Sequence, residues 1–301
     1  MKTLVIGFGS IGQRHCRILL ELGCRVAVVS RQDVIPFPAY RTMAEALQEF
    51  KPEYVIIANR TSEHYDTLAG LLAFGHDGPI LVEKPLFDKP HHLPLHQQKV
   101  FVGYNLRFHP VLHQLKQRLR SQSVISVQVY AGQYLPAWRP GDYRDCYSAR
   151  RADGGGVLRD LSHELDYTQW LFGTWTRVVA VGGHYSHLEI DSEDAVSLLM
   201  STNDCPIVNI QMNYLDRNRR REILINTDAH TYRADLVQNT LQTDDCTETY
   251  PCDLDATYLA QHQALLAGDF TTLCSVSEAQ ETLNLILNAE QSISEGRWMT
   301  R

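Results

Sequence analysis

Two short motifs carry side chains that could move a proton. The first is Glu83-Lys84-Pro85, which directly follows the apolar run Ile80–Val82. The carboxyl end of a parallel strand lies at the edge where open α/β sheets bind ligands. There, Lys84 could hydrogen-bond a substrate oxygen or, with a lowered pKa, relay a proton. A lone tripeptide of this kind also occurs as ordinary surface sequence, so its meaning depends on the rest of the chain.

The second motif is a helix preceded by Gly154, Gly155 and Gly156, three glycines that could let a ligand approach the backbone. The pattern predicts one helix over 157–172. His163 on this helix titrates near neutrality and can accept a hydroxyl proton, with Asp160 or Asp166 to orient it. Its apolar stripe contains Leu158, Leu161, Leu165 and Phe172, and Asp160, His163 and Tyr167 project from the opposite face. A merely solvated helix face is the alternative.

A glycine-rich segment precedes both motifs. Gly7-Phe8-Gly9-Ser10-Ile11-Gly12 follows the apolar run Leu4–Ile6 and opens a helix predicted over 11–22. The first glycine permits a tight turn, the second lets backbone approach a pyrophosphate, and the third allows close packing of helix on strand. The helix N-terminus then offers N–H groups to the phosphates. The segment predicts dinucleotide binding.

The residues after the second predicted strand distinguish the two nicotinamide cofactors. A carboxylate there would bind the ribose 2′-hydroxyl and repel a 2′-phosphate. The chain instead has Ser30 and Arg31, with Asp33 two residues further on. A hydroxyl and a guanidinium suit a phosphate, so NADP(H) is favoured over NAD(H). The alternative is that Arg31 is only a surface charge.

A long loop over 133–153 has the composition of a sugar-binding segment. Tyr143 and Tyr147 could stack on the C–H face of a sugar. Arg144, with Arg107 upstream, could hold a carboxylate or a phosphate. That these side chains merely brace the loop is an equally weighted alternative.

The remaining pattern predicts two domains. Residues 1–118 alternate buried strands with helices and predict an α/β Rossmann domain with a doubly wound parallel sheet. Residues 119–301 predict an α+β domain with an open, mostly antiparallel sheet, closed by a helix over 276–295 that could pack back on the first domain. The predicted strands are Leu4–Ile6, Arg25–Val29, Tyr54–Ala58, Ile80–Val82, Val100–Gly103, Arg177–Gly182, Ala195–Ser201, Pro206–Tyr214, Glu222–Asn226 and Thr231–Leu236.

Composition excludes several classes of protein. A net charge of −7 argues against nucleic acid as a partner, and no apolar run is long enough to predict a membrane span or a signal peptide. Seven cysteines without a CxxC pair predict reduced thiols in a cytoplasmic protein. His91, His92 and His96 have ligand-like spacing, but Pro90 and Pro94 interrupt any helix that would align them. No metal site is therefore expected.

Together these features resemble the Gfo/Idh/MocA oxidoreductases, the family of glucose–fructose oxidoreductase and inositol dehydrogenase. Five motifs occur in family order: the glycine-rich turn with His15 three residues on, Glu83-Lys84-Pro85, Gly103–Phe108, the triple-glycine helix with His163 and Asp166, and the closing helix. The resemblance implies Lys84 and His163 as the catalytic pair, with substrate between the domains. It also implies homodimers or homotetramers formed through the C-terminal sheet.

The chain departs from the family pattern at two places. Relatives usually carry Thr-Pro where this chain has Asn59-Arg60, and His64 follows shortly after. Relatives also space the helix carboxylate four residues before the histidine, whereas Asp160 is only three before His163. The segments Ser162-His163-Glu164, Asp142-Tyr143-Arg144 and Tyr147-Ser148 look like those of members associated with amino-sugar or nonulosonic-acid pathways.

The sequence thus predicts an NAD(P)-dependent oxidoreductase that moves a hydride between nicotinamide and a secondary alcohol or ketone of a sugar or sugar-acid derivative. An NAD-dependent glycosidase of the same fold and a non-catalytic cofactor-sensing protein are the alternatives. The residues expected at the cofactor are Gly7, Phe8, Gly9, Ser10, Ile11, Gly12, Ser30, Arg31, Asn59, Arg60, His64, Glu83 and Lys84. Those expected at the substrate are Arg107, Tyr143, Arg144, Tyr147, His163 and Tyr167.

Overall fold

A computed structural model describes residues 1–91, 99–138 and 141–301 of the chain. The chain divides into two compact units. The first unit comprises residues 1–105 and 254–280, and the second comprises residues 106–253 and 281–301. The chain therefore leaves the first unit, builds the second, returns to the first and ends in the second. His92 and His96, considered above as metal ligands, lie outside the described residues.

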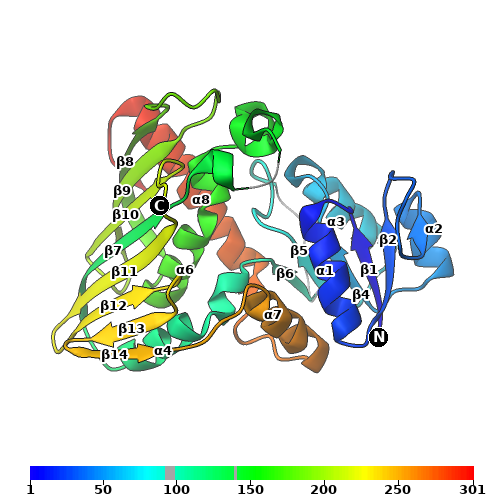
Figure 1. Ribbon diagram of the computed structural model, residues 1–301, viewed down its shortest axis with the longest axis horizontal. Coiled ribbons are helices and arrows are strands. Elements are labelled where there is room, and N and C mark those ends of the chain that lie inside the picture. The colour runs from blue at the N-terminus through cyan, green and yellow to red at the C-terminus, as the bar shows by residue number, and fades with distance from the viewer. Residues whose placement is uncertain (92–98, 139–140) are drawn as a thin grey trace. The chain divides into compact units, whose positions relative to one another are not determined.

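The first unit is built on a seven-stranded sheet of order β15-β6-β5-β4-β1-β2-β3, in which only β15 is antiparallel to its neighbour (Figure 1). The near-continuous apolar runs predicted buried strands, and β4 and β5 are buried throughout. The prediction of a doubly wound parallel sheet is confirmed. Its strands are β1 (Lys2–Ile6), β2 (Arg25–Val29), β3 (Ala39–Tyr40), β4 (Tyr54–Ile57), β5 (Ile80–Val82), β6 (Val100–Val102) and β15 (Cys274–Ser275).

The helices of this unit begin and end at recognisable capping residues. α1 (Ser10–Glu21) ends before Gly23, which adopts a positive φ of 75°. α2 (Met43–Glu49) begins at a capping box formed by Thr42 and Glu45. The other helical segments are η1 (Thr61–Glu63), α3 (His64–Ala73) and α7 (Ala256–Ala267), and α7 belongs to the returning segment.

The second unit is built on a nine-stranded sheet of order β14-β13-β12-β11-β7-β10-β9-β8-β16 (Figure 1). Every neighbouring pair is antiparallel except β7 with β10, so the predicted open, mostly antiparallel sheet is confirmed. The strands are β7 (Val124–Gly132), β8 (Trp175–Gly183), β9 (Ala195–Thr202), β10 (Ile207–Asn213), β11 (Arg220–Thr227), β12 (Thr231–Asp235), β13 (Thr240–Thr243), β14 (Cys246–Thr249) and β16 (Met299–Thr300).

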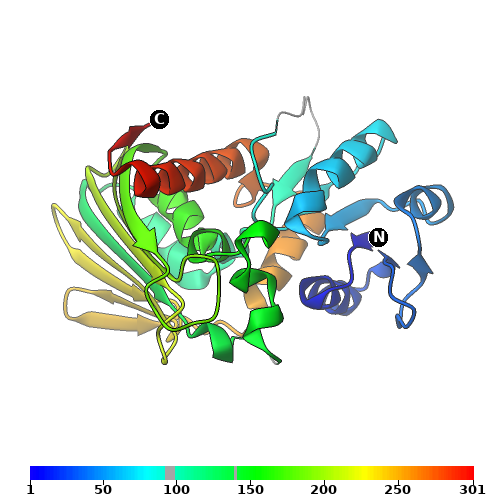
Figure 2. The same cartoon turned by 90° about the horizontal axis from the view of Figure 1, so that it is seen from above.

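Helices cover one face of this sheet. α4 (Pro110–Leu119), α6 (Ser162–Phe172) and α8 (Val276–Glu295) contribute Leu115, Leu165 and Ile286 to a single core with the inward strand residues. Figure 2 shows α8, drawn in red, running alongside the sheet. α8 has the predicted bounds, and the side chains of Ser275 and Glu278 cap it reciprocally.

The prediction of one helix over 157–172 is wrong. The structure has α5 (Val157–Asp160) and α6, separated at Leu161, whose φ and ψ of −95° and 29° leave the helical region. The helix is interrupted there, and Asp160 and Tyr167 are buried, so the open polar face expected from a regular helix does not form. The loop before α5 contains four short 3₁₀ segments, η3 (Leu135–Ala137), η4 (Tyr143–Asp145), η5 (Tyr147–Ala149) and η6 (Arg151–Asp153), and η2 (Asn105–Phe108) precedes α4.

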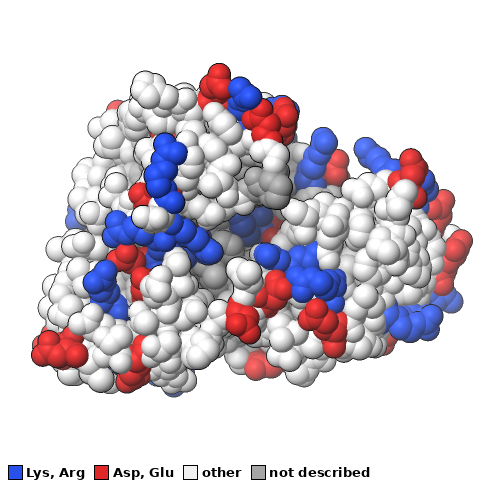
Figure 3. Space-filling model, viewed as in Figure 1, with Lys and Arg blue, Asp and Glu red and all other residues white. Residues whose placement is uncertain are grey.

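The surface is mixed in charge. On the face shown in Figure 3, basic and acidic side chains are interspersed over both units. Within the described ranges, none of the helices combines the length and the apolar character that crossing a membrane requires.

Candidate cofactor and active site

The turn between β1 and α1 has the geometry of a dinucleotide cradle. Gly7 adopts a positive φ of 100°, and a Cβ there would lie 2.5 Å from the carbonyl oxygen of Ala58. A Cβ on the buried Gly12 would collide with the carbonyl oxygen of Gly7, whereas one on Gly9 would meet open space. The backbone is therefore tight at Gly7 and Gly12 and open at Gly9, as a bound pyrophosphate requires.

The N-terminus of α1 is open to an anion. Gly9 is its N-cap and supplies no side-chain hydrogen bond, and Ser10 is exposed. Ile11 is half-buried, and Phe8 is buried edge-on against Phe37, with ring centroids 5.8 Å apart. The first N–H groups of a twelve-residue helix thus face outward beside the open glycine. These residues fit the phosphates of a nicotinamide dinucleotide.

The end of β2 adds basic groups to this cradle. Ser30 is half-buried, and its Oγ accepts from the backbone of Gln32 at 3.1 Å. Arg41, which the sequence did not single out, donates to the carbonyl oxygen of Arg31 at 2.7 Å and pairs with Asp33 at 2.7 Å. Asp33 is thereby neutralised. Within the described part of the chain, the exposed guanidinium of Arg31 makes no ion pair.

Lys84 lies in a turn at the same edge of the sheet, since it follows β5 as Gly7 follows β1. Its backbone N–H donates to Oε2 of Glu83 at 3.2 Å, and Oε1 of Glu83 pairs with Nε2 of the buried His15 at 2.9 Å. Glu83 is 7% exposed, so its carboxylate is held by the protein, not by solvent. In this structure it fixes the turn that presents Lys84.

The departure at Asn59-Arg60 lies beside this turn. Asn59 follows β4 and donates from Nδ2 to Thr67 at 2.9 Å, and Arg60 is exposed before η1. His64 was expected to face the cofactor, but it is 1% exposed. Its Nδ1 donates to the carbonyl oxygens of Pro85 and Leu86 at 3.1 and 3.2 Å, and burial lowers its pKa. His64 thus braces the residues after Lys84.

In the second unit, α5 and α6 carry the other candidate catalytic groups. His163 is half-buried in the first turn of α6. Asp160, at the end of α5, is 6% exposed and accepts from the hydroxyl of Tyr214 at 2.6 Å. Burial and the nearby Asp160 raise the pKa of Tyr214 well above its usual range, so the phenol remains a donor. Tyr214, on the segment after β10, is a partner that no sequence spacing could indicate.

Three predicted site residues are buried inside the second unit instead. Nε and Nη2 of Arg107 donate to both carboxylate oxygens of Asp166, with distances of 2.7 to 3.2 Å, and the two side chains are each 2% exposed. Tyr167 is fully buried, and desolvation raises its pKa well above its usual range. Arg107 was expected to hold a substrate anion, but it is buried and holds the carboxylate of Asp166 instead. Tyr167 was expected on an open polar face, but it is buried in the core.

Two of the three consecutive glycines before α5 allow close packing of the protein and do not leave room for a ligand. A Cβ on Gly155 would strike the carbonyl oxygens of Tyr147 and Ser148, and one on Gly156 would strike the carboxylate of Glu193. Glu193 also accepts from the backbone of Leu158 at 3.2 Å. Only Gly154, with a positive φ of 82°, has open space at its Cβ position. A ligand was expected to approach the backbone closely at all three glycines. At Gly155 and Gly156 other parts of the protein occupy that space instead.

The loop over 133–153 contains a cavity of about 370 Å³. Arg144 is tied to Asp142 and to Glu189 at 2.7 Å, and the hydroxyl of Tyr143 accepts from the backbone of Glu189 at 3.1 Å. Tyr147 is 42% exposed. The loop is thus braced internally, as the alternative held, and still leaves a hollow lined by Leu135, Trp138, Gly141, Asp142, Tyr143, Asp145 and Cys146.

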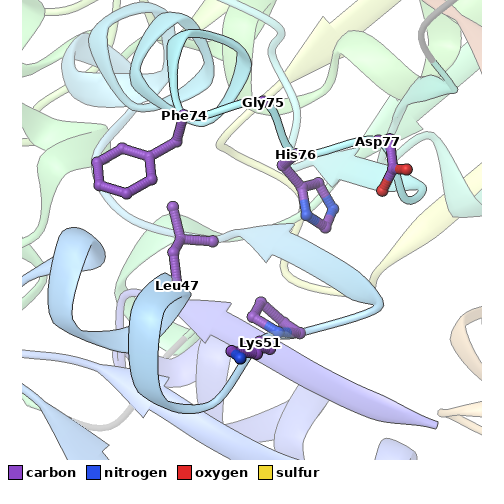
Figure 4. Close-up of a pocket in the computed structure, with 7 residues that line it drawn as sticks. Leu47, Lys51, Phe74, Gly75, His76 and Asp77 are labelled. Atoms are coloured by element: carbon purple, nitrogen blue, oxygen red, sulfur yellow. The ribbon is translucent and has the colours of Figure 1, made fainter.

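A smaller hollow of about 210 Å³ lies at the other edge of the first sheet, before β4 and β5 (Figure 4). It is lined by Leu47, Lys51, Pro52, Phe74, Gly75, His76 and Asp77. The cofactor cradle and Lys84 follow the carboxyl ends of the strands, so this hollow is on the wrong edge to serve them. Burial lowers the pKa of His76, which is an effect of packing.

Neither a metal centre nor a disulfide is formed by the residues that the structure describes. All seven cysteines are free thiols, and no three His, Cys, Asp or Glu side chains cluster with metal-binding geometry in residues 1–91, 99–138 and 141–301.

Comparison with known proteins finds a family match within the second unit. Residues 112–233 match the family model of the GFO/IDH/MocA C-terminal domain. The resemblance drawn from the sequence motifs is thereby confirmed. No curated protein matches the chain.

Solved structures of similar fold span nearly the whole chain. GenD2 from gentamicin A biosynthesis, in complex with NAD, is 20% identical with a TM-score of 0.82, over 100% of this chain and 96% of that one. A myo-inositol dehydrogenase from Corynebacterium glutamicum is 18% identical with a TM-score of 0.78, over 100% and 98%. UDP-N-acetylglucosamine 3-dehydrogenase GnnA from Acidithiobacillus ferrooxidans is 19% identical with a TM-score of 0.77, over 97% of each chain. At these identities the likeness shows the fold.

Proposed function

We propose that this protein, whose residues 112–233 match a GFO/IDH/MocA C-terminal domain, is an NAD(P)-dependent oxidoreductase acting on a sugar or sugar-acid derivative. The observation that supports the proposal is that two candidate functional segments lie at the same edge of the sheet of the first unit. The open backbone at Gly9 and the turn that presents Lys84 both follow carboxyl ends of strands in one parallel sheet. A cofactor cradle and a proton-handling lysine therefore share one edge of the sheet.

The cofactor would be held by the first unit. Its pyrophosphate would lie over Gly9 and the N-terminus of α1, and its adenosine ribose would lie near Ser30 and Arg31. Asn59, Arg60 and Lys84 follow the adjacent strands, where the nicotinamide half would lie. When bound, the nicotinamide ring supplies the acceptor or donor of a hydride. Because Arg41 neutralises Asp33, we favour NADP(H) over NAD(H).

The protein's own groups would handle the substrate oxygen and its proton. In the oxidative direction the carbinol carbon loses a hydride and the hydroxyl loses a proton. Lys84, in the first unit, would donate a hydrogen bond to that oxygen. His163 is the candidate proton acceptor that the second unit offers. We assign Asp160 rather than Asp166 as the carboxylate that supports His163, because Arg107 holds both oxygens of Asp166, whereas Tyr214 donates to one oxygen of Asp160.

A sugar is the substrate class that the loop cavity supports best. Trp138 and Tyr143 offer flat apolar surfaces, and Asp142 and Asp145 offer carboxylate oxygens to hydroxyl groups. Proteins of similar fold include dehydrogenases of myo-inositol and of UDP-N-acetylglucosamine. We therefore expect a polyol or a sugar ring with a free secondary hydroxyl or its ketone.

A panel of sugar alcohols with NADP⁺ and NAD⁺, and of sugar ketones with NADPH and NADH, tests the proposal by nicotinamide absorbance. We expect turnover with at least one sugar, abolished in Lys84→Ala with cofactor affinity nearly unchanged. Wild-type turnover in Lys84→Ala would contradict the assigned role. Cofactor that co-purifies and cycles without net oxidation during glycoside cleavage would favour the glycosidase, and cofactor binding without any turnover would favour the sensor.

A further inference from the structure

Four buried side chains of the first unit form one continuous hydrogen-bonded chain. The hydroxyl of Tyr54 lies 2.9 Å from Nδ1 of His262, Nε2 of His262 lies 2.8 Å from Nδ1 of His15, and Nε2 of His15 lies 2.9 Å from Oε1 of Glu83. Both imidazoles are 0% exposed, Tyr54 is 1% exposed and Glu83 is 7% exposed. We call this set the relay.

The chemistry of its members gives the relay a direction. The Glu83 carboxylate only accepts, so Nε2 of His15 donates to it. A neutral His15 then accepts at Nδ1, which requires His262 to donate from Nε2. Nδ1 of His262 in turn accepts from the hydroxyl of Tyr54. Every donor is thus matched with an acceptor, and all three hydrogen bonds point toward Glu83.

Burial favours this uncharged arrangement of the distal groups. Desolvation, and then the nearby His15, lowers the pKa of His262 well below its usual value. Desolvation likewise raises the pKa of Tyr54 well above its usual range. His262 therefore stays neutral and Tyr54 keeps its proton across the neutral pH range.

The near end of the relay reaches the backbone of Lys84. Oε2 of Glu83 accepts from the Lys84 N–H at 3.2 Å, and a Cβ on Gly103 would lie 2.8 Å from Oε1. The carboxylate is therefore confined between His15 and the residue that follows β6. Since it bonds the Lys84 backbone directly, a shift of Glu83 would shift Lys84.

We propose that Tyr54, His262 and His15 are positioning residues that act through Glu83 to set the place of Lys84. The inference rests on the proposed role of Lys84 in the reaction. His262 lies on α7, in the segment of the chain that returns to the first unit after the second is complete. The turn of Lys84 is thus supported through one residue, His262, that lies about 180 positions further along the chain.

Paired substitutions at His262 separate positioning from mere packing. In His262→Gln the amide N–H can donate to His15 and the amide oxygen can accept from Tyr54, whereas His262→Leu can do neither. With the sugar that the wild-type protein turns over fastest, we expect kcat to fall about tenfold in His262→Leu and less than about threefold in His262→Gln. The Kd for NADPH should stay within about twofold in both. Thr3→Val, which also removes a buried polar group of the first unit but lies on β1 outside the relay, is the control and should leave kcat unchanged.

A second measurement requires no substrate. ¹⁵N NMR of the histidine side chains should show His15 and His262 as neutral Nε2–H tautomers, and Tyr54→Phe should shift the Nδ1 resonance of His262 alone. An Nδ1–H tautomer at His262 would overturn the direction of the relay. Should His262→Leu fail to fold, Tyr54→Phe, which removes one oxygen atom, should lower kcat by about threefold.

The two proposals fail in different ways. If Lys84→Ala abolishes turnover while His262→Leu keeps the wild-type kcat, the positioning role is wrong and the proposed function stands. If Lys84→Ala keeps the wild-type kcat, the role of Lys84 is wrong and the positioning role is wrong with it.

Discussion

At the residue scale, the choice of cofactor depends on which charges near Ser30 are already paired. Arg41 holds Asp33 at 2.7 Å, so the carboxylate that would repel a 2′-phosphate is neutralised while Arg31 remains exposed. Arg31→Ala should therefore raise the Kd for NADPH by about tenfold, because one charge-assisted hydrogen bond is lost. The Kd for NADH should change by less than about twofold. Fluorescence titration with each cofactor measures the two Kd values. Replacing the exposed Arg25 by Ala is the control. A wild-type protein that binds NADH more tightly than NADPH would contradict the preference for NADP(H).

The ion pair of Arg107 and Asp166 is a contact that the spacing of residues in the sequence could not predict. The sequence analysis proposed both residues as site residues, but not as partners of each other. They lie 59 residues apart and meet only because η2 packs against α6. Removing one member leaves the other charge buried. Arg107→Met should therefore lower the free energy of unfolding by about 3–5 kcal/mol.

The double change Arg107→Met with Asp166→Leu should restore much of that loss, because no uncompensated charge remains. Urea denaturation followed by circular dichroism measures both variants. Arg144→Met, at an exposed pair, is the control and should change the free energy of unfolding by less than about 0.5 kcal/mol. A double variant as unstable as the single one would contradict the electrostatic account.

At the scale of elements, α4 begins at an unusual cap that depends on pH. Nδ1 of His109 accepts from the backbone of Val111 at 3.3 Å, and its Nε2 lies 3.2 Å from Oδ1 of Asn239. Burial lowers the pKa of His109 from 6.5 to about 4. A protonated Nδ1 could not accept, so the cap requires the neutral ring.

The sign of the pH dependence follows from that lowered pKa. Below pH 6.5 the unfolded chain gains a proton at this residue before the folded protein does, so its contribution to stability is complete above pH 6.5 and is lost as the pH falls to about 4. The loss is about 3 kcal/mol over that window. His109→Asn keeps an N-cap oxygen and should remove this part of the dependence. The difference between wild-type and variant unfolding curves across pH measures it, and parallel curves would contradict the assignment.

The elements themselves were mostly predictable, and the exceptions have physical reasons. β2 and α8 have the bounds read from apolar runs and caps. The predicted strands omit β7, although the alternation of Val127 and Val129 with Ser126 and Gln128 indicates a strand. The break at Leu161 and the docking of His262 depend on contacts with distant residues, which periodicity does not encode. The candidate catalytic motifs could therefore be proposed from the sequence, whereas the partners that hold their side chains could not.

At the scale of the whole molecule, the outer face of the nine-stranded sheet presents an apolar surface. Leu199 on β9 is 43% exposed and lies directly opposite Val179 on β8. Its diagonal neighbours on the flanking strands are Val181 and Ile207, which are 69% and 51% exposed. Contiguous exposed apolar side chains of this kind typically mark contacts between proteins. We propose that two or four copies of the chain associate through this face.

Leu199→Glu places a charge at the centre of this surface and should convert the oligomer to a monomer, since burying two like charges across a symmetric contact is strongly unfavourable. Size-exclusion chromatography with light scattering measures the mass. The Kd for NADPH should remain within about twofold, because the cradle belongs entirely to the first unit. Phe74→Glu, at an equally exposed apolar residue of that unit, is the control and should leave the mass unchanged. A wild-type protein that is already monomeric at micromolar concentration would contradict the proposed association, while an oligomer that survives Leu199→Glu would place the contact on another surface.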